Sequence, residues 1–332
     1  MRGIVETARN MAVGELSSSV AQIAGISVEM RFDNARLGND YLERLYLRPS
    51  NRPPCGTIYV LCGEGRFLEM PPPAVGALLP QGFHDGLAAD GMLASYPVTP
   101  GHWQFFDRAS RTAVLAIRRR EDLPPWDGSA PLRLLLQWLL DEHGVRVVHA
   151  ATVAAAGRGA VLFGRGGAGK SGTTLAALSV GMSTVGDDYI ALRLQGPPAA
   201  LPLFNCVKQD LPGIERVAGL RDALKQMTPN WRGKYEFDPR TVFPGAFVDE
   251  MALHAVILPQ IAQRPEPSVE QVNSSAALLA MLSSNLQYSP ADADGGFGKL
   301  SAFVRRLPCY RLNLSTDAEA NGRAIRSLLA EL

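Results

Sequence analysis

The residues best suited to chemistry form a glycine-rich run. Residues 164–171 read Gly-Arg-Gly-Gly-Ala-Gly-Lys-Ser, which fits the pattern G-x-x-x-x-G-K-[ST] at every fixed position. Glycines let a backbone curl around phosphate oxygens, the lysine reaches the β- and γ-phosphates, and the serine hydroxyl binds Mg²⁺. The run therefore predicts a site for a nucleoside triphosphate with Mg²⁺, with contacts from Gly164, Arg165, Gly166, Gly167, Ala168, Gly169, Lys170, Ser171 and Gly172.

Two adjacent acids, Asp187 and Asp188, follow about one helix and one strand later. We expect the strand that leads to them to run beside the strand that precedes the glycine run, which places both carboxylates near the γ-phosphate. One carboxylate could hold Mg²⁺, and the other could accept a proton from an attacking hydroxyl. A solvated turn is the alternative, but the position one βα unit after the glycine run favours function.

Four further residues are weaker candidates. His149 ends an apolar run and either supports the acids or is a core histidine. Lys208 could neutralise a transferring phosphoryl group, or could be a surface lysine. Lys234 and Arg240 lie with several aromatic residues in a stretch, 224–244, that predicts a long loop. Such a loop is either a substrate lid or a partly packed connection.

The elements that must position these residues follow from hydrophobic periodicity. A short strand at 160–163 leads into the glycine run, and a helix at 170–180 follows it. The remaining pattern predicts strands at 145–153 (carrying His149), 189–194, 252–258 and 309–314, and helices at 132–140, at 274–286 and, after a capping box at 316–319, up to Leu332. Strands alternating with helices in this way predict an α/β fold.

The first part of the chain has a different character. Strand-like runs at 57–62 and 112–117 alternate with turns, and Pro-Pro-Trp-Asp-Gly at 124–128 is typical of a linker. We therefore predict a smaller, mixed and β-rich N-terminal domain at 1–125, for substrate recognition or another accessory role. A catalytic domain would occupy 126–332.

Composition limits the partners. The formal net charge of the 332 residues is +1, which favours neither nucleic acid nor a membrane surface as a partner. The N-terminus lacks the apolar region of a signal peptide, and no apolar stretch reaches the roughly 18 residues of a membrane span. We expect a cytoplasmic protein.

Three segments resemble the catalytic core of HPr kinase/phosphorylase and its relatives, which include lasso-peptide precursor kinases. These are His149, the run Phe163–Ser171, and Val185-Gly-Asp-Asp-Tyr-Ile190. The resemblance covers about 130–195 well and the remainder of the chain more loosely. It implies a compact P-loop core related to phosphoenolpyruvate carboxykinase. It also implies ATP and Mg²⁺, a partner protein or peptide with a serine acceptor, such as a biosynthetic precursor peptide, and a homo-oligomer.

The resemblance also implies roles for single residues. Asp187 is the general base with His149 as its supporting partner, and Asp188 shares the metal with Ser171, although the two aspartate roles could be exchanged. Gly172 stands where HPr kinases commonly have an acid, and their Arg-Gly-x-Gly-like signature is not evident at 201–224. A small-molecule kinase, a bifunctional kinase/phosphorylase and a non-catalytic nucleotide sensor remain alternatives. The choice between ATP and GTP also stays open.

Overall fold

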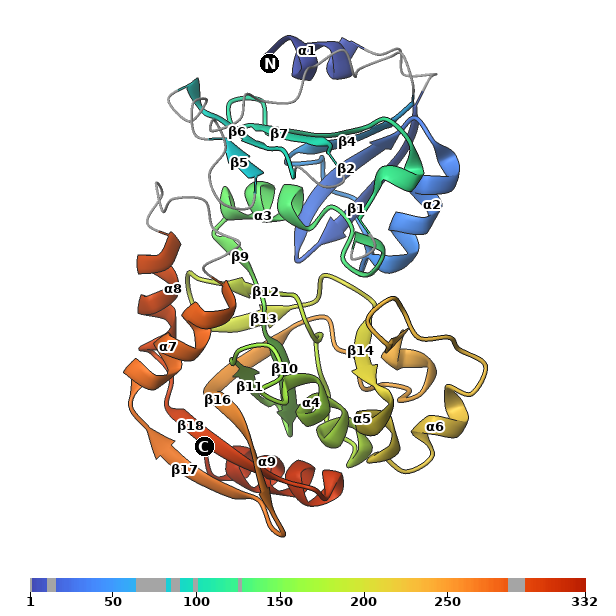
Figure 1. Ribbon diagram of the computed structural model, residues 1–332. Coiled ribbons are helices and arrows are strands. Elements are labelled where there is room, and N and C mark those ends of the chain that lie inside the picture. The colour runs from blue at the N-terminus through green and yellow to red at the C-terminus, as the bar shows by residue number, and fades with distance from the viewer. Residues whose placement is uncertain are drawn as a thin grey trace. The chain divides into compact units, whose positions relative to one another are not determined.

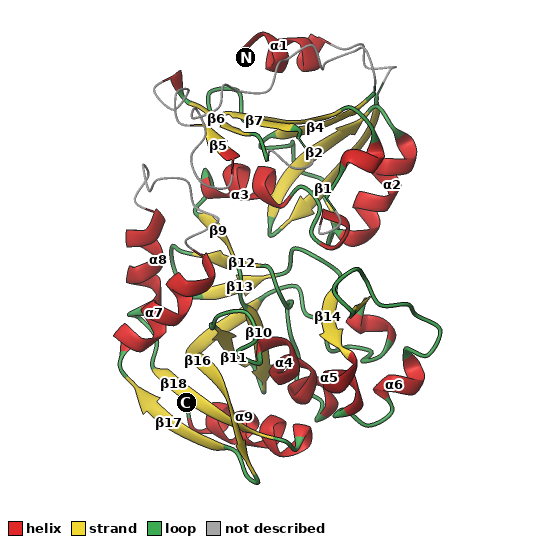
Figure 2. Cartoon of the chain, viewed as in Figure 1, coloured by secondary structure: helices red, strands yellow, loops and turns green. Residues whose placement is uncertain are grey.

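The computed structural model describes residues 2–10, 16–63, 82–84, 90–97, 101–124, 127–285 and 296–332 as a mixed α/β protein (Figures 1 and 2). Contacts within the chain divide it into two compact units, Met1–Val147 and Val148–Leu332. Within the described ranges, every helix is too short or too polar to cross a membrane. Each unit has its own sheet and its own buried core.

The first unit is built on a mixed sheet with the strand order β3-β1-β2-β4-β8-β7-β6-β5. Strands β2, β4 and β8 are parallel, and the other pairs are antiparallel. The bounds are β1 (Ser17–Ile23), β2 (Ile26–Phe32), β3 (Arg48–Pro49), β4 (Thr57–Cys62), β5 (Phe83–His84), β6 (Met92–Ser95), β7 (Trp103–Asp107) and β8 (Thr112–Ile117).

The first unit extends beyond the boundary expected at residue 125. Helix α3 (Arg133–Asp141) packs against β7 and β8 and buries its leucines, so the chain up to Val147 belongs to this unit. Residues 125–126 of the expected linker lie outside the described residues. The unit also contains α1 (Arg2–Asn10), α2 (Ala35–Arg44), η3 (Arg120–Asp122) and η4 (Asp127–Ser129), and β9 (Val145–Val148) leads out of it.

The second unit has a sheet in which β10 (Ala151–Ala155), β11 (Arg158–Leu162), β16 (Met251–Arg264), β13 (Ala199–Leu201) and β12 (Ile190–Arg193) are neighbours in that order. The distal part of β16 also pairs in parallel with β18 (Cys309–Ser315), and β18 pairs with β17 (Ser268–Val272). β11 and β16 are parallel. The glycine run therefore leaves the carboxyl end of a strand in the middle of a sheet.

Helices cover both faces of this sheet because successive side chains of β11 point to opposite sides. Ala160 and Leu162 pack with α4 (Lys170–Ser179) and α9 (Ala318–Glu331). Val161 and Phe163 pack with α7 (Ser274–Asn285) and α8 (Gly296–Val304) on the other face (Figure 1). Both faces of β11 are consequently buried from Gly159 onward, which explains the apolar run at 160–163.

The stretch 224–244, expected as a long loop, contains a strand. β15 (Lys234–Phe237) pairs in antiparallel register with β14 (Val207–Asp210). Phe237 and Val207 pack against the leucines of α4, and this burial holds the hairpin beside the glycine run. Two short helices, α5 (Leu211–Glu215) and α6 (Leu220–Ala223), fill the connection, and η5 (Pro239–Thr241) follows β15.

Two strand predictions need correction. The strand expected at 145–153 is broken, since β9 ends at Val148, β10 begins at Ala151, and His149 lies between them. β16 continues through Pro259 instead of ending at Leu258. The N–H of Val256 points toward β18, and successive N–H groups of a strand point to opposite neighbours. The position of Pro259, which has no N–H, therefore faces the β11 side, where β11 has already ended. A proline there interrupts no ladder hydrogen bond.

Two further local predictions differ from the structure. The segment before Asp187 forms only isolated bridges, Ala154 with Ser183 and Thr184 with Phe247, so it lies beside β10 and not beside β11. Helix α9 is capped by Asp317, whose carboxylate accepts the Ala320 N–H at 3.0 Å. The expected cap was Thr316, one residue earlier.

Candidate functional site

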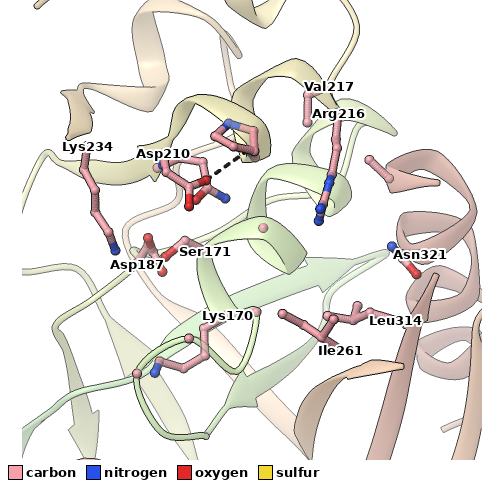
Figure 3. Close-up of a pocket in the computed structure, with 18 of the residues that line it drawn as sticks. Lys170, Ser171, Asp187, Asp210, Arg216, Val217, Lys234, Ile261, Leu314 and Asn321 are labelled. Carbon is pink, nitrogen blue, oxygen red and sulfur yellow. Dashed lines mark hydrogen bonds between the residues drawn. The ribbon is translucent and has the colours of Figure 1, made fainter. Parts of the chain in front are cut away.

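A cavity of about 560 Å³ lies in the second unit, beside the glycine run (Figure 3). Its walls come from the glycine loop and first turn of α4, the Asp187-Asp188 turn, β14 with α5, the first residue of β15, β16, β18 and α9. The candidates from the sequence that line it are His149, Gly166, Gly167, Gly169, Lys170, Ser171, Gly172, Asp187, Asp188 and Lys234. The fold thus gathers residues far apart in the chain.

The glycine loop joins β11 to α4. Gly169, the residue before the helix, has φ +103°, and a Cβ there would lie 2.6 Å from Leu314 Cδ1. Only glycine satisfies both constraints. The first turn of α4 lines the cavity, and the first N–H groups of a helix have no partner within it. The cavity therefore offers donors and the positive end of a helix dipole to an anion.

Lys170 is the first residue of α4 and is 7% exposed. Its Nζ donates to the carbonyl oxygen of Gly164 at 2.7 Å, so the ammonium lies across the glycine loop. Burial lowers the pKa of Lys170, while the charges of Asp187 and Asp188 oppose that change. The side chain is a buried cation at the place where the loop would hold phosphates.

Asp187 is a buried acid, and the residue is 2% exposed. Neither carboxylate oxygen has a hydrogen-bond partner of ordinary geometry within the described part of the chain. Burial raises the pKa of Asp187, and the neighbouring charge of Asp188 raises it further, while Ser171, Lys170 and His149 oppose the rise. Figure 3 shows its carboxylate beside Ser171. A buried, unsatisfied acid is costly for the fold and is typical of a functional site.

Asp188 has the opposite surroundings. Its Oδ1 lies 3.1 Å from His149 Nε2, and its Oδ2 accepts a hydrogen bond from Lys208 Nζ at 2.7 Å. Burial alone would raise the pKa of Asp188, but the contacts with His149 and Lys208 outweigh it and hold the pKa well below its usual range. The family resemblance implied that His149 supports Asp187; in the structure it contacts Asp188.

Two threonines, both fully buried, hold the approach to the aspartates. The Thr152 hydroxyl accepts the N–H of Val185, and the Thr184 hydroxyl accepts the N–H of Gly186, each at 3.0 Å. Thr184 also donates to the carbonyl of Thr152 at 2.8 Å. These bonds fix the backbone just before Asp187. Threonines inside apolar runs give no functional signal in the sequence.

Asn285, the last residue of α7, fixes the backbone of His149. Its Oδ1 accepts the His149 N–H at 2.7 Å, and its Nδ2 donates to the His149 carbonyl at 3.4 Å. The amide thus replaces the strand partner that the break between β9 and β10 removes. The sequence could not predict this role of Asn285, because Asn285 lies 136 positions after His149 in the chain.

The acids of the site fit a magnesium ion better than a metal held by protein alone. No group of three or more His, Cys, Asp or Glu that could hold a metal occurs among the residues described. Mg²⁺ usually takes one or two carboxylates and completes its shell with phosphate oxygens and water. The Asp187 oxygens have no competing partner, whereas those of Asp188 are taken by His149 and Lys208. Ser171 and Asp187 are therefore the better pair of ligands.

Of the remaining residues predicted from the sequence, some lie at the cavity and others do not. Lys208 is in the site through Asp188, and Lys234 lines the cavity. Arg240 does not line it, because its exposed guanidinium is paired with Asp238 at 2.6 Å. Gly164, Arg165 and Ala168 belong to the glycine loop but do not line the cavity. Residues that line it without having been expected include Gln209, Asp210, Arg216, Ile261, Leu314 and Asn321.

Comparison with known proteins places few constraints on these residues. The chain matches no family model, and it matches no curated protein. Among solved structures it is similar to the Hpr(Ser) kinase/phosphatase from Coxiella burnetii. The two are 15% identical, the match covers 56% of this chain and 97% of the other, and the TM-score is 0.31. The function of the chain therefore has to be inferred from the residues of its own site.

Proposed function

We propose that this protein is an ATP-dependent phosphotransferase that transfers the γ-phosphoryl group to a serine or similar hydroxyl of a protein or peptide, for example a biosynthetic precursor peptide. The observation that carries the proposal is the pair of consecutive aspartates in opposite electrostatic surroundings, both facing the glycine loop and Lys170 in one cavity. Two carboxylates whose pKa values are pushed apart are suited to two different roles.

The nucleotide would bind with its phosphates on the glycine loop and the first turn of α4. Lys170 would exchange its contact with the Gly164 carbonyl for phosphate oxygens, which are better partners for a buried ammonium. Ser171 and Asp187 would hold Mg²⁺, which supplies charge neutralisation on the phosphates. That ligand role exchanges the two aspartates relative to the first expectation from the family resemblance.

Asp188 would then accept the proton of the acceptor hydroxyl, since a carboxylate offers about four acceptor positions and His149 and Lys208 occupy two of them. His149 and Lys208 hold it in place from two sides and keep it ionised. A carboxylate of low pKa is a weak base, but phosphoryl transfer loses the acceptor proton late and depends mainly on positioning and charge. A fixed, ionised carboxylate is therefore sufficient, and His149 acts as its positioning residue.

The test is intact-mass spectrometry after incubation with ATP and Mg²⁺, using serine peptides encoded beside this gene, and HPr, as acceptors. The wild type should add one phosphoryl group to an acceptor, and Asp188→Asn should lose transfer while still binding ATP. Asp187→Asn should lose transfer together with the Mg²⁺ dependence of ATP binding. If the wild type binds ATP but phosphorylates no peptide, the peptide-kinase proposal fails and a small-molecule acceptor or a nucleotide sensor takes its place.

A further inference from the structure

Lys234 is a second cation in the cavity, in addition to Lys170 of the glycine loop. It is the first residue of β15, on the hairpin that faces the glycine loop, and its side chain is half-buried. Figure 3 shows its amino end directed into the cavity, toward the side where Asp187 and Ser171 lie. Lys170 reaches the same cavity from the glycine loop, so two lysines approach it from different walls.

The hairpin itself gives Lys234 no counter-ion. The residue opposite it in the register is Asp210, the natural partner for a cross-strand ion pair. Asp210 is used elsewhere, since it caps α5 and its Oδ1 accepts the Gly213 N–H at 3.0 Å. In the described part of the chain, Lys234 forms no ion pair, whereas Lys208 of the same hairpin does.

The other lysine of the hairpin shows the contrast. Lys208, on β14, forms an ion pair with Asp188 at 2.7 Å and so holds that carboxylate in place. Lys234 is close enough to Lys170 for its charge to lower the pKa of Lys170, which is a repulsion between like charges. Two repelling cations in one cavity are stabilised when an anion lies between them.

The backbone of Lys234 is held by a tight turn. The Asn230 side-chain oxygen accepts the N–H of Lys234 at 3.1 Å and that of Arg232 at 2.9 Å, and the Asn230 N–H donates to the Lys234 carbonyl at 2.7 Å. Trp231, in the same turn, is 53% exposed. A movement of Lys234 would therefore be transmitted to an exposed tryptophan three residues away.

We propose that Lys234 binds the terminal phosphoryl group of the nucleotide, and that the β14–β15 hairpin thereby distinguishes a nucleoside triphosphate from a diphosphate. The inference rests on the proposed function, because it takes the glycine loop as the phosphate site. During transfer the lysine would neutralise charge on the moving phosphoryl group. Because Lys234 enters the cavity from the hairpin and not from the glycine loop, we expect it to contact the terminal phosphoryl group, while Lys170 and the loop amides hold the α- and β-phosphates.

The experiment measures the dissociation constants of a non-hydrolysable ATP analogue and of ADP, both with Mg²⁺, by isothermal titration calorimetry. In Lys234→Met the analogue should bind about tenfold more weakly or worse, as expected for a lost charge-assisted contact. ADP affinity should stay the same, so the preference for triphosphate disappears. Lys234→Arg should keep most of the preference for the triphosphate analogue over ADP. Lys225→Met, an exposed lysine on the same segment outside the cavity, is the matched control.

Tryptophan emission supplies a second readout on the same proteins. The analogue should change the emission and ADP should not, and both Lys234→Met and Trp231→Phe should remove the change. A Lys234→Met protein that keeps the wild-type preference for the analogue overturns the inference while leaving the phosphate site intact. A wild type that binds neither nucleotide overturns the phosphate site, and the role of Lys234 with it.

Discussion

Replacing Asp187 by asparagine should stabilise the second unit at neutral pH while abolishing phosphoryl transfer. Asp187 is 2% exposed and its two carboxylate oxygens have no partner of ordinary geometry in the described part of the chain, so the folded state bears a desolvation penalty that Ser171, Lys170 and His149 offset only in part. Because the pKa of Asp187 is raised by burial, the folded protein binds its proton more tightly than the unfolded chain. Stability is therefore lost as the pH rises through the folded-state pKa.

The size of the effect follows from the same observation. Each unit of pKa difference corresponds to about 1.4 kcal/mol, and a buried unsatisfied polar group costs about 1–3 kcal/mol. The asparagine amide still has to be buried, so the net gain should be about 1–2 kcal/mol. For a unit of this size that is a rise in melting temperature of roughly 2–8 °C. Below the unfolded-state pKa both side chains are neutral, and the difference should vanish.

Differential scanning calorimetry of the full chain, with EDTA to remove divalent cations, measures this effect. Asp188→Asn is the matched control, because the same substitution one residue later removes the partner of Lys208 and His149. It should destabilise by about 1–3 kcal/mol, less than for a fully buried pair, since the Asp188 side chain is 24% exposed. If Asp187→Asn destabilises at neutral pH as Asp188→Asn does, Asp187 is not an unpaired buried charge and the reasoning fails.

Three further predictions concern stability. Thr184→Val should cost about 1–3 kcal/mol in urea unfolding, because it leaves the Gly186 N–H unpaired, whereas Thr184→Ser should not. Asp317→Ala should cost about 1 kcal/mol in the same assay by removing the cap of α9, and an equal stability would contradict the assigned cap. Burial raises the pKa of Asp127 to about 6 although Tyr41 donates a hydrogen bond to it. Its contribution to the first unit is therefore lost as the pH rises from about 4 to about 6, and Tyr41→Phe should steepen that loss in calorimetric scans at pH 4 and pH 7.

The sequence was sufficient where local pattern determines structure. The strand and helix expected on either side of the glycine run are β11 and α4, and the late helices and strands lie near their expected places. These elements carry their own periodicity and turn residues, so short stretches encode them. Lys170, Ser171 and Asp187 could be chosen as candidates for the same reason, because they belong to short motifs with fixed spacing.

Contacts between segments that are distant in the sequence could not be predicted from local patterns. Lys234 and Arg240 looked equivalent in a polar stretch, and only the pairing of β14 with β15 separates them. The hairpin turns Lys234 into the cavity, while Arg240 pairs with the nearby Asp238. The amide of Asn285 behind His149 depends on the packing of α7 on β16, which no local pattern encodes.

The different surroundings of the two aspartates, on which their proposed roles rest, have a cause in the backbone. Asp188 has φ +75°, uncommon outside glycine, and the Tyr189 N–H donates to the Asp187 carbonyl at 3.0 Å. A turn of this kind is strained by of order 1–3 kcal/mol. It sends two consecutive side chains in different directions, one toward Ser171 and the other toward His149 and Lys208.

An extended backbone at Asp188 would also separate the two carboxylates, but by pointing one of them away from the cavity. The strained turn keeps both facing it while surrounding each with different partners. The Thr152–Thr184 hydrogen bonds fix the entry to the turn, and the two contacts of Asp188 fix its exit. Strain at this position is thus the condition under which one dipeptide could carry the two proposed roles, metal binding by Asp187 and acceptor orientation by Asp188.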